Sequence, residues 1–139
     1  LDVKTDYDAG LRAKPFVATH RAFTNLAYET KANDKGGQWR FDGTVQWVGQ
    51  ARIPDTFTNP EEFQVSDRSS GYTLINAQVT RVITKDFEVY LGGENLGNFR
   101  QPNPILSAEN PSSDYFDASL VWGPIFGRMA YGGLRWTLK

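Results

Sequence analysis

The stretch Tyr131-Gly-Gly-Leu-Arg-Trp-Thr-Leu138 shows the structural type of this chain most clearly. Its residues alternate: Leu134, Trp136 and Leu138 fall on one face, and Tyr131, Gly133 and Arg135 fall on the other. Successive side chains of a β-strand point to opposite faces, so a period of two indicates a strand. The stretch predicts a strand with one apolar face and one polar face.

The same alternation recurs along the chain, whereas apolar residues at helical spacing never persist for three turns. It predicts strands over residues 19–30, 38–50, 73–83, 87–94 and 130–138, and Leu1 to Tyr7 resembles the end of one more. Arg81 is the exception on an otherwise apolar face, and its place near a strand end lets it reach a polar boundary. The prediction is an all-β chain of about six strands.

The connections between these strands alternate in length. Short turns at residues 31–37 and 84–86 alternate with long segments at about 51–70 and 99–127. Outer-membrane barrels have short turns at one end and long loops at the other. The order of lengths therefore favours an antiparallel up-and-down β-barrel that spans a membrane.

Composition excludes several classes of protein. The 139 residues carry a net charge of −1, which gives no basic excess for nucleic acid, and the absence of cysteine removes disulfides and zinc-thiolate sites. The sequence contains no run of about 18 apolar residues, the length that a transmembrane helix needs, and its first residues are too polar for a signal peptide. We expect the chain to begin within a longer protein.

Aromatic residues make up 14% of the chain and collect at strand ends. Tyr28, Trp39, Phe87 and Trp136 lie beside the short turns or the carboxy terminus, and Trp47 lies near the opposite ends. This distribution is typical of the aromatic girdles of a membrane barrel. The alternative, that these rings fill the core of a β-sandwich, stays open.

The last strand also resembles a known signal. Tyr131, Gly133, Trp136 and Leu138 match the barrel-assembly signal of outer-membrane proteins, in which a polar residue and a glycine precede alternating apolar residues. Lys139 departs from that pattern, because the family commonly ends on the apolar residue itself.

Other stretches are similar to the carboxy-terminal part of TonB-dependent outer-membrane receptors. Val89-Tyr-Leu-Gly-Gly-Glu-Asn-Leu-Gly-Asn-Phe99 resembles the penultimate strand of that family, and Gly127-Arg128 followed by Ala130 to Leu134 resembles the last strand. Weaker likeness at Pro15-Phe16-Val17 and at Trp47 to Asp55 extends the resemblance over nearly the whole chain.

The resemblance implies that residues 1–139 are the carboxy-terminal portion, about the last six strands, of a barrel of about 22 strands with a plugged lumen. The plug and the earlier strands would then lie outside this sequence. It further implies the outer membrane of a Gram-negative bacterium, uptake of a scarce nutrient such as a ferric siderophore, haem, cobalamin or oligosaccharide, and no cofactor. The implied partners are outer-membrane lipid, the rest of the barrel and its plug, the barrel-assembly machinery, and the TonB complex through an amino-terminal segment.

Two groups of residues are candidates for contact with a plug or a solute. The polar faces of the strands would line the lumen with Arg40, Asp42, Gln46, Asn76, Gln78, Glu88 and Glu94, most of which we expect to make structural contacts. Gly92 and Gly93 would let a strand bend or a plug approach closely. The long loops would capture ligand through Arg52, Asp55, Phe57, Phe99, Arg100, Tyr115 and Trp122, unless these residues pack the loops on one another.

No candidate for catalysis or metal binding emerges. His20 is the only histidine, and no serine lies in a nucleophile elbow. Glu109, Asn110, Asp114 and Asp117 offer oxygen ligands, but their spacing matches no calcium loop. We expect no enzyme. The rival of another class is a secreted, soluble β-sandwich that binds carbohydrate.

Overall fold

A computed structural model describes residues 4–7 and 10–138 of the chain. The fold over these residues is all-β. Its elements are β1 (Lys4–Tyr7), β2 (Gly10–Ala13), β3 (Arg21–Glu29), β4 (Gln38–Val48), the short 3-10 helix η1 (Glu61–Phe63), β5 (Tyr72–Thr84), β6 (Phe87–Glu94) and β7 (Met129–Trp136).

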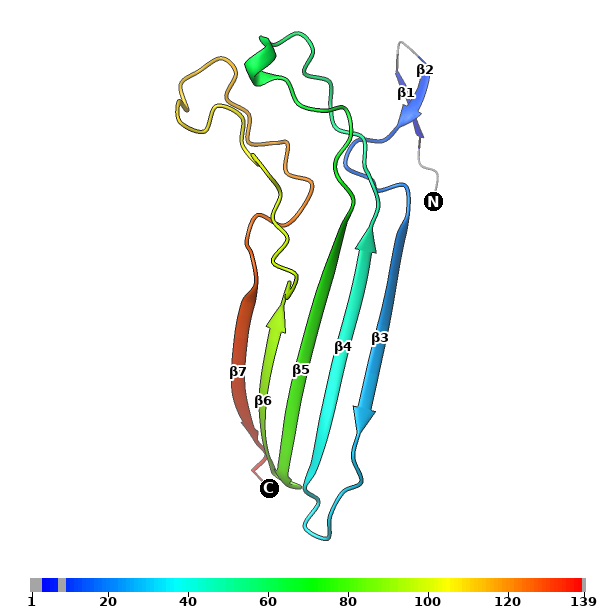
Figure 1. Cartoon of the computed structure of the whole chain (residues 1–139), viewed down its shortest axis with the longest axis vertical. Helices are drawn as coiled ribbons and strands as arrows, with labels where there is room; N and C mark the ends of the chain where they lie inside the picture. Colours follow the sequence, from blue (N-terminus) through cyan, green and yellow to red (C-terminus); the bar gives the residue numbers. More distant parts are fainter. Residues whose placement is uncertain (1–3, 8–9, 139) are drawn as a thin grey trace. The chain divides into compact units, whose positions relative to one another are not determined.

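Strands β3 to β7 form one antiparallel sheet in which every strand neighbours the next along the chain (Figure 1). The up-and-down order places the two short turns at one end of the sheet and the two long connections at the other. The outer strands β3 and β7 each pair on one side within the described sheet, which is therefore open and not a closed barrel.

Two predictions of strand number and extent were wrong. The strand expected over Leu1 to Tyr7 is β1, which pairs with β2 in a separate two-stranded sheet, so the main sheet has five strands and not six. Residues 1–3, 8, 9 and 139 lie outside the described part of the chain.

The last strand ends earlier than its alternation predicts. β7 stops at Trp136, because β6 begins at Phe87 and Phe87 is the residue opposite Trp136. One further bond continues past the strand, from the amide of Thr137 to the carbonyl of Asp86, at 2.8 Å. Leu138 therefore lies beyond the sheet, and the prediction that it belongs to the apolar face of the strand was wrong.

The predicted turns are confirmed and have a local cause. Between β3 and β4 the side-chain oxygen of Asn33 accepts bonds from the amides of Lys35 and Gly37, at 3.0 and 2.8 Å. Gly36 has a φ of +80°, a conformation that glycine adopts without strain. Lys85 and Asp86 alone separate β5 from β6.

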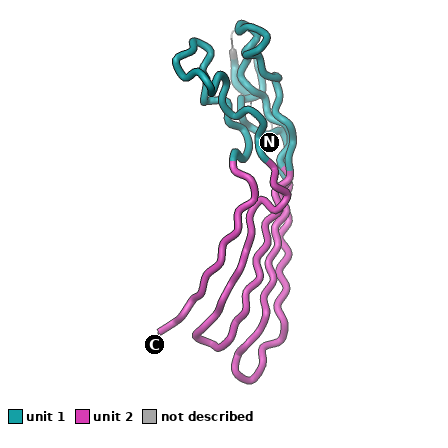
Figure 2. Tube along the Cα trace, turned by 60° about the vertical axis from the view of Figure 1, so that its left-hand side comes forward, with its two compact units in different colours: residues 1–21, 48–72, 100–125 teal, residues 22–47, 73–99, 126–139 magenta. Residues whose placement is uncertain are grey.

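The chain divides into two compact units, coloured in Figure 2. One comprises residues 1–21, 48–72 and 100–125, which include the long connections, and its small core consists of Ile53, Leu106 and Leu120 with Val65 and Trp122 packed against them. The other comprises residues 22–47, 73–99 and 126–139 and holds most of the five-stranded sheet.

A search of the described residues for a helix long and apolar enough to cross a membrane found none.

Candidate functional site: the two faces of the sheet

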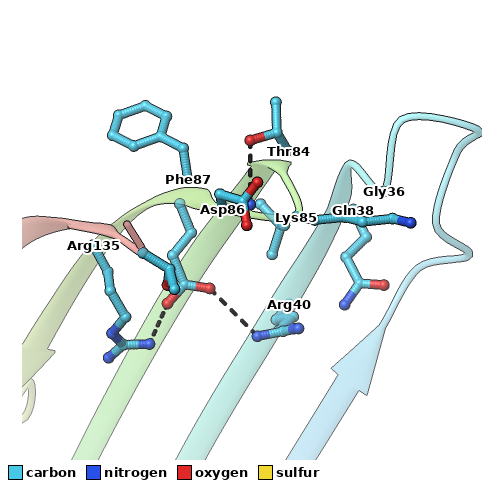
Figure 3. Close-up of a pocket in the computed structure, with 11 residues that line it drawn as sticks. Gly36, Gln38, Arg40, Thr84, Lys85, Asp86, Phe87 and Arg135 are labelled. Carbon is cyan, nitrogen blue, oxygen red and sulfur yellow. Dashed lines mark hydrogen bonds and ion pairs between the residues drawn. The ribbon is translucent and has the colours of Figure 1, made fainter. Parts of the chain in front are cut away.

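A network of charges crosses the polar face of the sheet. The carboxylate of Glu88 on β6 pairs with the guanidinium of Arg135 on β7 and, at 3.5 Å, with that of Arg40 on β4 (Figure 3). Arg40 pairs in turn with Glu29 on β3, at 3.5 Å. The alternation predicted that these side chains share a face, and the ion pairs confirm it.

The network spans β5 because the residues beneath it are small. Val82 lies opposite Glu88 in the β5–β6 register and is 7% exposed, and Thr80 is 5% exposed. Neither side chain is long enough to separate Arg40 from Glu88. The side chain of Glu88 is itself only 14% exposed, and the two arginines compensate for much of the solvent that this carboxylate has lost.

Farther along the same face, two tyrosines cover two glycines. Tyr131 on β7 lies opposite Gly92 on β6, and Tyr90 on β6 lies opposite Gly133 on β7. A Cβ atom at Gly92 would overlap the ring of Tyr131, and one at Gly133 would lie 2.5 Å from the Tyr90 hydroxyl. The space over Gly92, which we expected to admit a bend or a plug, is filled by this ring.

The two faces differ in exposure in the opposite sense to a soluble sheet. On the polar face, Thr80 and Val82 are buried and Asn76, Gln78, Glu88 and Tyr90 are partly buried. On the apolar face, Leu91 is 62% exposed, Leu134 is 67% exposed, and Trp39, Phe41 and Trp47 are also exposed. In the central strands β4, β5 and β6 the more enclosed face is the polar one.

Aromatic rings gather on the apolar face near the short turns. Phe41 stacks with Tyr28 and with Trp39, with 6.2 Å between ring centroids in each pair. The guanidinium carbon of Arg81 lies 5.0 Å from the centroid of Trp39. Two residues of the predicted girdle, Tyr28 and Trp39, thus each contact Phe41.

The long connections are packed on their own side chains. Phe63 stacks on Tyr115 with centroids 4.9 Å apart, and Tyr72 contacts Trp122 at 6.1 Å. Arg52 donates a hydrogen bond to the carbonyl of Ala13, at 3.2 Å. Asp55 accepts a bond from the amide of Phe57. Tyr115 and Trp122 therefore pack against other aromatic rings, as the alternative to ligand capture predicts.

Gln101 organises the last long connection. Its side-chain nitrogen donates to the carbonyl of Leu120, at 2.9 Å, and its oxygen accepts from the amides of Trp122 and Gly123, at 2.7 and 2.9 Å. It is 5% exposed. No sequence signal singled out this residue, because an isolated glutamine in a loop carries no periodicity.

The predicted lumen-facing residues are partly brought together. A hollow of about 400 Å³ on the polar face is lined by Arg40, Asp42, Gln78 and Glu88 along with Thr80, Tyr90, Tyr131 and Arg135. Asn76 lies apart and accepts a bond from the amide of Asn95, at 2.9 Å. Gln46 and Glu94 do not line the hollow.

The other predicted sets are more scattered. Of the assembly-signal residues, Tyr131 and Gly133 share the polar face, Trp136 lies on the apolar face, and Leu138 follows the strand. Of the loop residues, Phe57 is 66% exposed, whereas Trp122 is partly buried. Phe99 falls in the unit with the sheet and Arg100 in the other unit.

Thr80, Tyr90 and Arg135 belong to the hollow but were not among the predicted site residues. Arg135 could have been found from sequence, because antiparallel pairing of β6 and β7 sets it opposite Glu88. Tyr90 could have been found in the same way, since it falls opposite a glycine.

No cluster of three or more histidine, cysteine, aspartate or glutamate side chains able to hold a metal occurs within the described ranges. The contact recorded for His20 is made by its backbone: its carbonyl accepts a hydrogen bond from the amide of Gly49, at 2.9 Å. No protein-family profile, no curated protein sequence and no solved structure matches this chain.

Proposed function

We propose that this chain is part of the wall of a TonB-dependent transporter in the outer membrane of a Gram-negative bacterium, within a barrel of about 22 strands. In this role the apolar face contacts lipid, the polar face lines the lumen, and the long connections face the outside. The transported solute is a scarce nutrient of the siderophore, haem, cobalamin or oligosaccharide class. The chain is a scaffold and carries out no catalysis.

The observation that carries the proposal is the inverted exposure of the sheet. A sheet in water turns its apolar face inward, because burying apolar surface is the main favourable term in folding. Here Leu91 and Leu134 are exposed while Glu88 and Thr80 are enclosed. A lipid-facing wall around a polar lumen has this distribution.

Strand length and topology give further support. A membrane-spanning strand needs about 9–11 residues. β3, β4 and β5 have 9, 11 and 13 residues, and β6 and β7 have 8 each. Short turns at one end and long connections at the other are the usual arrangement of outer-membrane barrels.

The soluble carbohydrate-binding sandwich is less well supported. A sandwich needs a second sheet packed on the apolar face of the first, about 10 Å away. The other sheet in the described residues has two strands of four residues each, too small to cover five strands.

Cysteine accessibility in the full-length protein tests the proposal, since this chain contains no cysteine of its own. Leu91→Cys and Phe57→Cys replace side chains of similar exposure, 62% and 66%. In intact cells a membrane-impermeant maleimide should label Phe57→Cys and not Leu91→Cys, and denaturation should make both reactive. Equal labelling of the two in the native protein would rule out a lipid-facing Leu91.

Solubility and growth separate the two proposals further. We expect the full-length protein in the outer-membrane fraction, and we expect its deletion to impair growth on one scarce nutrient. Residues 1–139 that were soluble without detergent and melted cooperatively as a monomer would favour the sandwich.

A further inference from the structure

Arg81 is the one charged residue on the apolar face of the described sheet. It lies opposite Val89 in the β5–β6 register, with Ala77 and Val79 before it on the same face of β5. The remaining positions of that face, from β3 to β7, are apolar, small, tyrosine or threonine. A charged guanidinium on an otherwise apolar face is unfavourable unless a polar or charged group interacts with it.

The structure gives Arg81 an aromatic contact and no carboxylate. Its guanidinium lies 5.0 Å from the centroid of Trp39, a cation–π distance. No ion pair to Arg81 forms among residues 4–7 and 10–138. By contrast, Arg40 and Arg135 on the opposite face are both balanced by carboxylates. The charge of Arg81 is oriented by a ring but not neutralised.

The position of Arg81 along β5 suits contact with lipid headgroups. It lies three residues before Thr84, the last residue of the strand, or about 10 Å along it. Arginine side chains at this depth extend toward the membrane surface and keep the charge among polar groups. Trp39 and Tyr28, the neighbouring rings, are residue types enriched at that boundary.

Basic residues surround this end of the sheet. The adjoining turns carry Lys31, Lys35 and Lys85 against Asp34 and Asp86, and Lys85 runs beside Gly36 of the neighbouring turn. With Arg81 the positive charges outnumber the negative ones. Lysine and arginine near a membrane surface attract anionic lipids.

We propose that Arg81 and Trp39 form a binding site for the phosphate of an anionic phospholipid, in the leaflet on the side of the short turns. The guanidinium donates hydrogen bonds to the phosphate oxygens, and the Trp39 ring holds the guanidinium in place. Lys85 adds long-range attraction. The site rests on the proposed function, because it requires the apolar face to lie in lipid.

Lipid binding to the purified full-length protein tests the site. Native mass spectrometry in detergent, with added phosphatidylglycerol or phosphatidylethanolamine, measures how many molecules of each are retained and how tightly. We expect phosphatidylglycerol to bind more tightly, and Arg81→Gln to weaken its tightest site about fivefold, which corresponds to about 1 kcal/mol. Arg81→Lys should bind phosphatidylglycerol with an affinity between those of the wild type and Arg81→Gln, because lysine keeps the charge but lacks the planar guanidinium.

Arg21→Gln is the matched control, since it removes the same charge from the polar face, where β3 carries Arg21 and Glu29 with the same parity. It should leave phosphatidylglycerol binding unchanged. Arg81→Gln removes an unbalanced charge and should not impair assembly. Should it fail to assemble, Arg81→Lys and Trp39→Leu provide the same comparison.

The outcomes separate the two proposals. Identical phosphatidylglycerol binding by the wild type, Arg81→Gln and Arg21→Gln, all in assembled barrels, would overturn the lipid site and leave the transporter proposal standing. Equal loss in both variants would mean nonspecific charge attraction and would also overturn the site. A full-length protein that is soluble without detergent would overturn both.

Discussion

The hydroxyl of Tyr131 on β7 donates a hydrogen bond to the side-chain oxygen of Gln78 on β5, at 3.1 Å, across the whole width of β6. The bond is possible because the residue of β6 beneath the ring is Gly92, over which the ring can lie flat on the sheet. Three strands are thus joined on the polar face by one side chain. Gly92 and Tyr131 act as a pair, so a change in either should disturb the other.

Gly92→Val should destabilise the sheet by about 1–3 kcal/mol, because its side chain must displace the Tyr131 ring. The loss can be measured as a lower midpoint of unfolding of the full-length protein in detergent. Gly43→Ala is the control, since a Cβ there meets no atom within 4 Å, and its free energy of unfolding should stay within about 0.5 kcal/mol of the wild type. Equal effects of the two changes would refute the pairing.

Glu88→Gln should cost about 1–3 kcal/mol, because it leaves Arg40 and Arg135 facing each other without the carboxylate between them. Glu94→Gln, on the same face of β6 but outside the hollow, should cost far less. In a double-mutant cycle, Arg40→Gln should have a smaller effect once Glu88 is replaced. Strict additivity of the two changes would show that the pair contributes no coupling.

With Leu91 on the proposed lipid-facing side, Leu91→Arg should lower the stability of the assembled protein by about 2–4 kcal/mol, the cost of a cation near the middle of a membrane. In water the same change at a side chain that is 62% exposed would cost almost nothing. Leu11→Arg, at a leucine of β2 that is 70% exposed, serves as the control. Unchanged stability of Leu91→Arg would argue against contact with lipid.

Gln101→Ala should loosen the last long connection, because three backbone groups lose their partner in a buried position. Limited proteolysis of the folded protein should then cut between residues 101 and 125 faster than in the wild type. Gln50→Ala, an exposed glutamine, should leave the cleavage rate unchanged. Protease resistance equal to that of the wild type would mean that Gln101 does not hold this segment.

The sequence was a good guide to the sheet, since alternation is a local property. The parity of Glu88, Leu134 and Arg135 could be read directly. The register of β5 on β6 could not be read from the two-residue turn after Thr84, because the pairing shifts by one residue between Val82 and Thr84. The end of β7 was not predictable from Leu138 itself, because a strand ends where its partner β6 begins.

The site was predicted less completely for a similar reason. The reach of Arg40 to Glu88 depends on the small residues Thr80 and Val82 on the strand between them, and this appears only when three strands are placed side by side. The fate of the loop aromatics was equally hidden, because the stacking of Phe63 on Tyr115 joins connections that are far apart in the chain.

The number of strands in the sheet also has a consequence for its two edges. Because its strands alternate in direction and five is odd, β3 and β7 run the same way. Joining these two edges directly would make a parallel pair, so a closed and fully antiparallel wall that contains this sheet must add an odd number of strands. In such a wall the strand that meets β7 must run opposite to it, and so must the strand that meets β3, which makes the direction of both neighbours a geometric requirement.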